Sequence, residues 1–278
     1  MQTVSVGVLG STSFVGDSLL PQLKQSYAVV PLTRTFATAS ESEDGKTPSQ
    51  IPYWISLMPI WALPDYFSML EAFGARRIVA LSSTSVFAKA ASSDVAERML
   101  AARILDGEQR LAAWASDHDV EWLVLRPTLI YGAGRDRNVS EMARFIRRFG
   151  FFPVLGSAQG LRQPVRSSDV AAACVCALAA KSLKNCSYNI SGEEVLTYRN
   201  MIVRIFQALA KRPRLVPVPL GLFRVAVAGL RMLPRYRDWS VAMAERMSRD
   251  LVFDNAAAKR DFGFSPSPFQ LTSADLPR

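Results

Sequence analysis

The sequence predicts an α/β fold built on a doubly wound parallel sheet, with a smaller, mainly helical lobe in the C-terminal part of the chain. Two observations carry this prediction. Short apolar runs alternate with amphipathic stretches along the first two thirds of the chain, and the first run leads through a glycine-containing turn into a helical pattern. In addition, 278 residues with 49% hydrophobic content are enough to bury an extended core.

The order of the expected elements follows the hydrophobic period along the chain. Runs rich in β-branched residues are expected as strands, and stretches with one apolar helical face as helices. Residues 37–50 are polar and are expected to form a loop, and the pattern beyond Gly192 is one of helices and turns. The expected strands are residues 4–9, 28–33, 54–57, 77–81, 121–125 and 187–190, and the expected helices are residues 17–25, 64–73, 95–116, 139–149 and 168–180.

The charge is distributed unevenly. Residues 1–120 carry 9 Lys and Arg against 12 Asp and Glu, whereas residues 121–278 carry 24 against 12. This basic second half indicates either a solvated surface or contact with an anionic ligand. No nucleic-acid-binding motif accompanies the charge, so no nucleic-acid partner is expected.

A cytoplasmic location is the default expectation. No membrane span is predicted, because the most apolar stretch, residues 215–234, is interrupted by arginines and prolines. No basic leader precedes the first strand pattern. Cys174 and Cys176 lie in an apolar helical run, which predicts reduced, buried thiols and no metal site.

The turn that opens the chain is the most informative local signal. It reads Gly10-Ser11-Thr12-Ser13-Phe14-Val15-Gly16, with serine at the position of a middle glycine. A dinucleotide-binding turn needs glycines so that the backbone bends sharply and a pyrophosphate can reach the N–H groups of the next helix. An ordinary strand-to-helix turn is the alternative, but the position between the first strand and the first helix favours a dinucleotide site.

The end of the second expected strand bears on the choice of cofactor. Many NAD-binding proteins place an acidic residue about 20 residues beyond the turn, where it binds the ribose hydroxyls. Here the segment reads Thr33-Arg34-Thr35. A guanidinium suits a 2′-phosphate, so Arg34 predicts NADP in preference to NAD, with an ordinary surface arginine as the alternative.

Five blocks along the chain resemble the extended and atypical short-chain dehydrogenases/reductases, which include the NAD-dependent epimerases and dehydratases of nucleotide-sugars. The blocks occur in the family's order and span nearly the whole chain. They are the turn at Gly10 to Gly16, Leu81-Ser82-Ser83-Thr84-Ser85-Val86-Phe87, Leu125-Arg126-Pro127-Thr128-Leu129-Ile130-Tyr131-Gly132, Arg162-Gln163-Pro164-Val165-Arg166-Ser167-Ser168-Asp169-Val170-Ala171, and Phe253-Asp254-Asn255-Ala256 leading to Phe262-Gly263-Phe264-Ser265-Pro266.

The resemblance implies a Rossmann-type NAD(P)-binding domain of residues 1–131 and 168–191, and a substrate lobe of residues 132–167 and 192–278. It implies that Ser83 holds the reacting hydroxyl or carbonyl, although a hydroxyl that caps a turn is the alternative. It also implies that Arg162 binds the substrate diphosphate, with Thr84 on the substrate side. The cofactor-binding residues it implies are Gly10, Ser11, Thr12, Ser13, Phe14, Val15, Gly16, Arg34, Leu57, Ser82 and Pro127.

Two departures from the family pattern affect the chemistry and the sheet. The family's catalytic pair is Tyr-x-x-x-Lys, in which the tyrosine moves the proton that accompanies hydride transfer. Alignment on Gly107-Glu108 puts Leu100 at the Tyr position and Ile104 at the Lys position, and residues 88–120 contain no tyrosine. The second departure is the short polar stretch before Tyr53, from which we expect the sheet to lack a strand on that side.

Other proton sources stay open. Lys89 follows the serine-rich block and Tyr131 follows the sixth strand of the family pattern. His118, the single histidine, stands between Asp117 and Asp119 and is expected as a surface loop residue.

The expected function is that of an NAD(P)-dependent epimerase, dehydratase or reductase that acts on a nucleotide-sugar or a similar carbonyl or hydroxyl compound. The alternative is a catalytically degenerate relative that binds a dinucleotide in a structural or regulatory role, which the missing Tyr and Lys favour. A homodimer is left open. A third hypothesis is association with a membrane surface through residues 215–237, against packing of that stretch inside the lobe.

Overall fold

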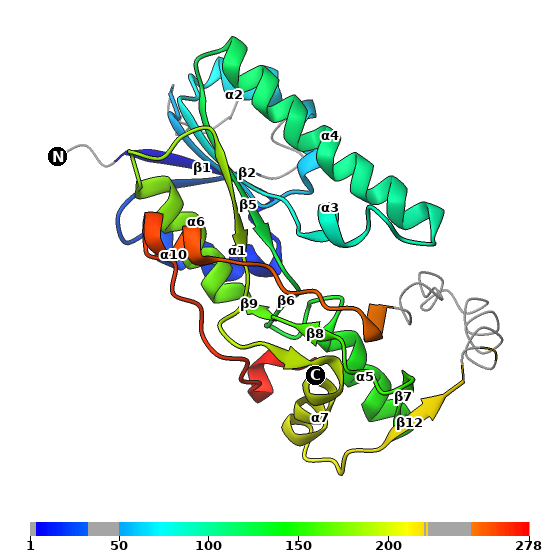
Figure 1. Cartoon of the computed structure of the whole chain (residues 1–278). Helices are drawn as coiled ribbons and strands as arrows, with labels where there is room; N and C mark the ends of the chain where they lie inside the picture. The colour runs from blue at the N-terminus through cyan, green and yellow to red at the C-terminus, as the bar shows by residue number, and fades with distance from the viewer. Residues whose placement is uncertain (1–3, 33–49, 220, 222–245, 278) are drawn as a thin grey trace.

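The chain is built around a six-stranded parallel sheet (Figure 1). The structure is a computed structural model, and it describes residues 4–32, 50–219, 221 and 246–277. The strand order is β10-β5-β4-β3-β1-β2. The strands are β1 (Ser5–Leu9), β2 (Ala28–Leu32), β3 (Tyr53–Ser56), β4 (Arg77–Leu81), β5 (Glu121–Pro127) and β10 (Cys186–Ile190).

This order confirms the expected doubly wound fold. The chain passes from β1 to β2 on one side and then returns to β3 on the other side of β1. The crevice at the carboxyl ends of the strands beside such a switch point is the usual ligand site of open α/β sheets. Among the described residues β2 is the edge strand on its side, while Arg34 and most of the predicted polar loop lie outside the described residues.

Helices cover both faces of the sheet. One face carries α1 (Phe14–Leu23), α6 (Ser167–Ala179) and α10 (Ala256–Phe262). The other carries η2 (Ile60–Tyr66), α2 (Phe67–Ala72) and α4 (Val95–Asp117), and a short helix α3 (Ser85–Ala88) precedes α4. Figure 1 shows α4 on one side of the sheet and α1 and α6 on the other. Both faces are therefore buried, as parallel sheets require.

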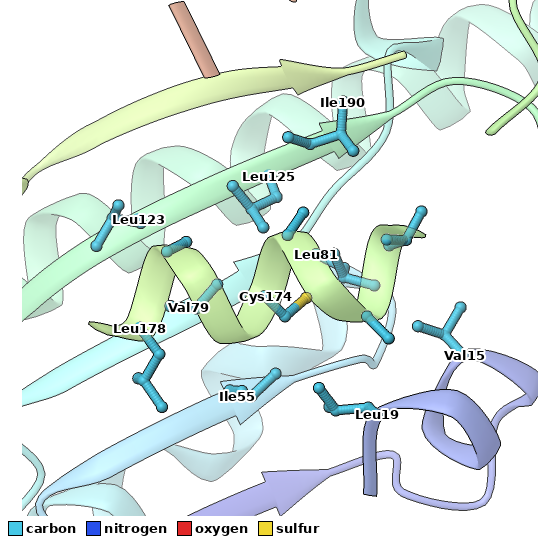
Figure 2. Packing of buried hydrophobic residues seen from close by; sticks show 14 of the residues in the cluster. Val15, Leu19, Ile55, Val79, Leu81, Leu123, Leu125, Cys174, Leu178 and Ile190 are labelled. Atoms are coloured by element: carbon cyan, nitrogen blue, oxygen red, sulfur yellow. The ribbon is translucent and has the colours of Figure 1, made fainter. Parts of the chain in front are cut away.

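A nearly unbroken apolar run forms helix α6, which is buried against the sheet. It lies across the sheet, where Cys174 and Leu178 pack with Val79 and Leu123 (Figure 2). Its small residues let α1 approach closely on its other side. Burial raises the pKa of the Cys174 thiol to about 12, so this group remains protonated at neutral pH.

The remaining residues form a second lobe with its own hydrophobic core. The helix α5 (Val139–Phe149) buries Phe145 and Ile146 there and ends at Gly150, whose φ of +76° is left-handed. The other elements are α7 (Tyr198–Ala208), the paired strands β6 (Ile130–Tyr131) with β9 (Val165–Arg166), β7 (Phe152–Leu155) with β12 (Leu215–Val218) and β8 (Leu161–Arg162) with β11 (Leu196–Thr197), and the short helices η4 (Arg246–Ser248) and η5 (Ser273–Asp275).

Several predicted elements need correction. The helix expected over residues 64–73 is divided between the 3₁₀ helix η2, which begins at Ile60, and α2, which begins at Phe67. The first helix begins at Phe14, three residues before its predicted start, because Ser13 caps it. The strands β11 and β12 lie in a region expected to hold only helices and turns, and most of residues 215–237 lie outside the described part. No helix in the described ranges is both long and apolar enough to cross a membrane.

Candidate functional site

Most of the residues expected to bind the cofactor converge on one edge of the sheet. The register of the strands pairs Leu9 with Ser56, and Leu81 with Leu125. The segments that follow β1, β3 and β4 therefore begin at neighbouring points on the carboxyl edge. Gly10, Leu57 and Ser82 therefore follow neighbouring strands along this edge, and their role in cofactor binding stays a prediction.

The glycine turn depends on glycine at both ends. Gly10 has a φ of +74°, and a Cβ there would lie 3.2 Å from the backbone carbon of Leu57. A Cβ at Gly16 would lie 2.1 Å from the carbonyl oxygen of Ser11, which no side chain tolerates. Gly10 thus supplies the left-handed bend, and Gly16 lets α1 pack directly on the turn.

Ser13, at the position of the missing middle glycine, is the N-cap of α1. Its Oγ accepts a hydrogen bond from the N–H of Gly16 at 3.1 Å. This bond satisfies one of the first-turn donors of the helix. The N–H groups of Phe14 and Val15 have no intrahelical partner, since they belong to the first turn. The turn can therefore present backbone N–H donors to an anion, although fewer of them than the first turn of an uncapped helix would present.

The serine-rich segment after β4 is engaged with the protein backbone. Ser83 Oγ accepts from the N–H of Ser85 at 3.1 Å, which is the turn-capping role that the sequence left as the alternative. Thr84 is buried, and its hydroxyl donates to the carbonyl oxygen of Pro127 at 3.2 Å. The segment is thus held against the end of β5, and Ser83 keeps a half-buried hydroxyl at the sheet edge.

A buried ion pair at the same edge was missed by sequence reasoning. Arg126 binds the Glu108 carboxylate in a bidentate manner, with Nε–Oε1 at 2.9 Å and Nη2–Oε2 at 2.5 Å. Ser82 Oγ donates to Glu108 Oε1 at 2.5 Å. Glu108 is 6% exposed, so the pair links α4 to the ends of β4 and β5 inside the protein. Two features of the sequence could have indicated this ion pair: a carboxylate on the buried face of α4 and an arginine at the end of a strand.

The two positions of the family's catalytic pair differ in their surroundings. Ile104 is 2% exposed and packs with Ile60 and Leu63 in the core beneath α4, whereas Leu100 lies half-buried at the margin of that core. The backbone of η2 comes close because Gly107 has no side chain; a Cβ there would lie 2.8 Å from the carbonyl carbon of Ile60. The residue at the position of the family's Lys is therefore part of the hydrophobic core.

Both alternative proton sources have partners. Lys89 Nζ lies 3.9 Å from Glu97 Oε1, and the pKa of Lys89 is lowered, first by burial and then by Arg246. Tyr131 is completely buried in the second lobe, where Arg166 Nε donates to its hydroxyl at 3.5 Å. Burial raises the pKa of Tyr131. Of the two, only Lys89 combines partial exposure with a titration moved toward neutral pH.

Arg162 is buried, and backbone carbonyls surround its guanidinium. Its Nη1 donates to the carbonyl oxygens of Leu161 at 2.7 Å and Arg249 at 2.8 Å, and its Nη2 to that of Arg246 at 2.5 Å. Burial lowers the pKa of Arg162 to about 10. In this arrangement Arg162 anchors the η4 segment, and its predicted contact with a substrate diphosphate stays a prediction.

His118 follows the end of α4 and lies on the surface. Its Nε2 is 3.2 Å from Glu71 Oε1, and its ring stacks on Trp114. Within the described ranges no three His, Cys, Asp or Glu residues are grouped as a metal site.

A doubly wound parallel sheet, a glycine turn at its switch point and a second lobe built from segments before and after β10 define a Rossmann-type α/β protein. Residues 65–191 match the model of the NAD dependent epimerase/dehydratase family. This match covers somewhat less than half of the chain and supports the resemblance found in the sequence.

Individual known proteins are more distant. An uncharacterized protein, y4nG, of Sinorhizobium fredii is 27% identical over 207 residues, which are 70% of this chain and 50% of that protein. The mitochondrial NADH dehydrogenase [ubiquinone] 1 alpha subcomplex subunit 9 of Arabidopsis thaliana is 27% identical over 156 residues, covering 52% of this chain and 39% of that one. The chain thus spans half or less of the length of these curated relatives.

The solved structures agree on the fold. The crystal structure of UDP-glucuronic acid 4-epimerase from Bacillus cereus in complex with NAD superimposes with a TM-score of 0.68. The match covers 98% of this chain and 93% of that one at 14% identity. At this identity the likeness establishes the fold alone.

Proposed function

We propose that the protein binds a nicotinamide dinucleotide at Gly10–Gly16 and acts as an epimerase, dehydratase or reductase on a nucleotide-sugar or a similar carbonyl or hydroxyl compound. The observation that carries the proposal is the glycine turn. Its left-handed bend and the first-turn donors of α1 lie at the switch point of the sheet. The family match and the NAD complex of the Bacillus cereus epimerase support the same class of ligand.

The preferred cofactor in this proposal is NADP(H). The support comes from Arg34, which stands where NAD-binding proteins carry an acidic residue. A hydrogen bond from a guanidinium to a 2′-phosphate contributes about 1.5–3 kcal/mol. That corresponds to roughly a 10- to 100-fold preference in affinity.

In the proposed reaction the nicotinamide supplies or accepts the hydride, and this chain positions the substrate and handles the proton. Ser83 is proposed to hydrogen-bond the reacting oxygen, and Pro127 to lie beside the cofactor. Leu100 and Ile104 offer no proton, and general acid–base catalysis typically contributes about 10²–10⁴-fold. We therefore expect turnover lower by about that factor, unless Lys89 supplies the proton.

The second candidate function is binding without turnover, in a structural or regulatory role. The observation that favours it is the burial of Ile104, which commits the family's Lys position to the hydrophobic core. The Arabidopsis relative is named as a subunit of NADH dehydrogenase. A role within a larger assembly is in keeping with that name.

The first prediction concerns the cofactor site and uses two glycines with the same backbone conformation. Gly10→Val forces a side chain into the left-handed bend and against Leu57, which should distort the turn that would receive the pyrophosphate, and we expect no measurable binding of NADPH or NADH by calorimetry. Gly150→Val is the matched control, since its φ is +76° and nothing lies within 4 Å of its Cβ position. Unchanged affinity in Gly10→Val would refute the site.

Turnover separates the two candidate functions. Wild type and Ser83→Ala are assayed with NAD(P)+ and NAD(P)H on a panel of UDP- and dTDP-sugars. Slow turnover that falls further in Ser83→Ala supports the enzyme, whereas bound cofactor without turnover on any compound supports the structural role.

A further inference from the structure

An arginine of the second lobe contacts the glycine turn directly. Arg135 lies between β6 and α5 in the sequence, more than 100 residues from the turn. Its Nη2 donates to the carbonyl oxygen of Thr12 at 3.0 Å, and its Nη1 binds Asp17 Oδ2 at 2.6 Å. The guanidinium therefore lies over the segment where the proposed dinucleotide would place its phosphates.

The turn itself has a deficit that this arginine offsets. Ser13 already occupies the N–H of Gly16, and Asp17 puts a carboxylate on the first turn of α1. A carboxylate there interacts favourably with the helix dipole but repels a pyrophosphate. Arg135 neutralises Asp17 and adds a fixed positive charge beside the remaining backbone donors.

The guanidinium also has capacity left for a ligand. It carries five N–H donors, and the contacts with Thr12 and Asp17 use two of them. The Arg135 side chain is 55% exposed, so a ligand can reach it without opening the core. Its planar fork matches two oxygens of a phosphate, which a lysine cannot do.

We propose that Arg135 is a pyrophosphate-binding residue that the second lobe contributes to the dinucleotide site. The proposal rests on the proposed function, because it assumes a dinucleotide at Gly10–Gly16. Its consequence is that the cofactor is held from both sides, by the turn of the sheet domain and by the segment that leads into α5.

If the ion pair had a purely structural role, Arg135→Ala would lower the stability of the protein. Both partners are about half exposed, and such pairs contribute little to stability. Under the proposal, Arg135→Ala should therefore leave the midpoint of thermal unfolding nearly unchanged while it lowers the affinity for the dinucleotide.

The test compares affinities for three ligands in four proteins. Calorimetry measures NADPH, NADH and ADP-ribose binding to wild type, Arg135→Ala, Arg135→Lys and Arg137→Ala. Arg137 is an exposed arginine two residues further on, and its replacement removes the same charge. We expect Arg135→Ala to raise every dissociation constant about tenfold, Arg135→Lys to have a smaller effect and Arg137→Ala almost none.

Comparison of the three ligands shows which part of the dinucleotide Arg135 contacts. An equal loss for NADPH and NADH excludes the 2′-phosphate as the partner, and an equal loss for ADP-ribose excludes the nicotinamide. Unchanged or tighter binding in Arg135→Ala would overturn the proposal, the latter by showing that the arginine covers the turn. If wild type binds ADP-ribose through Arg135 but shows no turnover, the pyrophosphate-binding role of Arg135 stands and the enzyme proposal falls. If wild type binds none of the three ligands, both fall.

Discussion

Single positions decide whether a family site keeps its chemistry. Leu100 and Ile104 are four residues apart on α4 and so lie on the same side of that helix. Yet only Ile104 is fully inside the core, with 2% of its surface exposed. A lysine there would need its ammonium group to leave water, which lowers its pKa and the stability of the protein.

The residue-scale prediction separates the two positions. Ile104→Lys should lower the free energy of unfolding by about 4 kcal/mol at pH 7, because the buried amine must lose its proton. Leu100→Tyr should change it by less than about 1 kcal/mol, since the ring can reach the surface. Urea unfolding measures both, with Ile104→Met as the volume-matched control. Equal stability of the Lys and Met variants would contradict the burial of this site.

The helix α4 links several parts of the molecule at the scale of one element. Its buried face carries Glu108, which binds Arg126 and Ser82 at the ends of two strands. In the first turn of the helix, Glu97 accepts from Ser92 Oγ at 2.7 Å and pairs with Arg246 of η4. The helix thereby connects the sheet edge to the C-terminal segment.

The element-scale prediction tests the buried pair with a double-mutant cycle. Glu108→Leu leaves the Arg126 charge without its partner and should cost about 3 kcal/mol of stability, by analogy with other broken buried pairs. Glu108→Leu combined with Arg126→Met removes both charges and should recover most of the loss. Chemical denaturation measures all four proteins. Additive losses in the double variant would show that the two groups do not interact.

At the scale of the whole molecule, the sheet domain and the second lobe have separate hydrophobic cores. Arg135 joins the second lobe to the glycine turn through Thr12 and Asp17, and within that lobe Arg166 of β9 pairs with Asp275 at 3.1 Å and Arg147 of α5 donates to the carbonyl of Pro277. Arg162 and Arg246 add contacts from β8 and α4 to the η4 segment. Hydrogen bonds and ion pairs of Arg135 and Arg246 therefore contribute to holding the two lobes together.

The whole-molecule prediction concerns stabilisation by the cofactor. A ligand at about 100 times its dissociation constant stabilises the native state by about 2.7 kcal/mol. For a chain of this size that corresponds to a rise of roughly 5–10 °C in Tm. Differential scanning fluorimetry should show this rise with NADPH and a smaller one with NADH at the same concentration. A larger rise with NADH would contradict the role proposed for Arg34.

Much of the fold could be predicted from the sequence because its signals are local. The helix over Val139–Phe149 and the strand Arg77–Leu81 were predicted with their observed bounds, since apolar period and capping residues are properties of neighbouring positions. The division of residues 60–72 into two helices was not predicted, although Pro64 is a local signal.

The sequence by itself determined the alternation of strands and helices in the sheet domain, the glycine turn and the absence of Tyr and Lys at the positions of the catalytic pair of the matched family, because each is a matter of residue type and spacing. Only the tertiary structure decided which side chains remain available for chemistry. Arg162 is engaged by backbone carbonyls, Glu108 is paired with Arg126, and Arg135 reaches a turn more than 100 residues away. These contacts join residues far apart in the chain, and hydrogen bonds of that kind depend on where the packing of sheet and helices places each backbone.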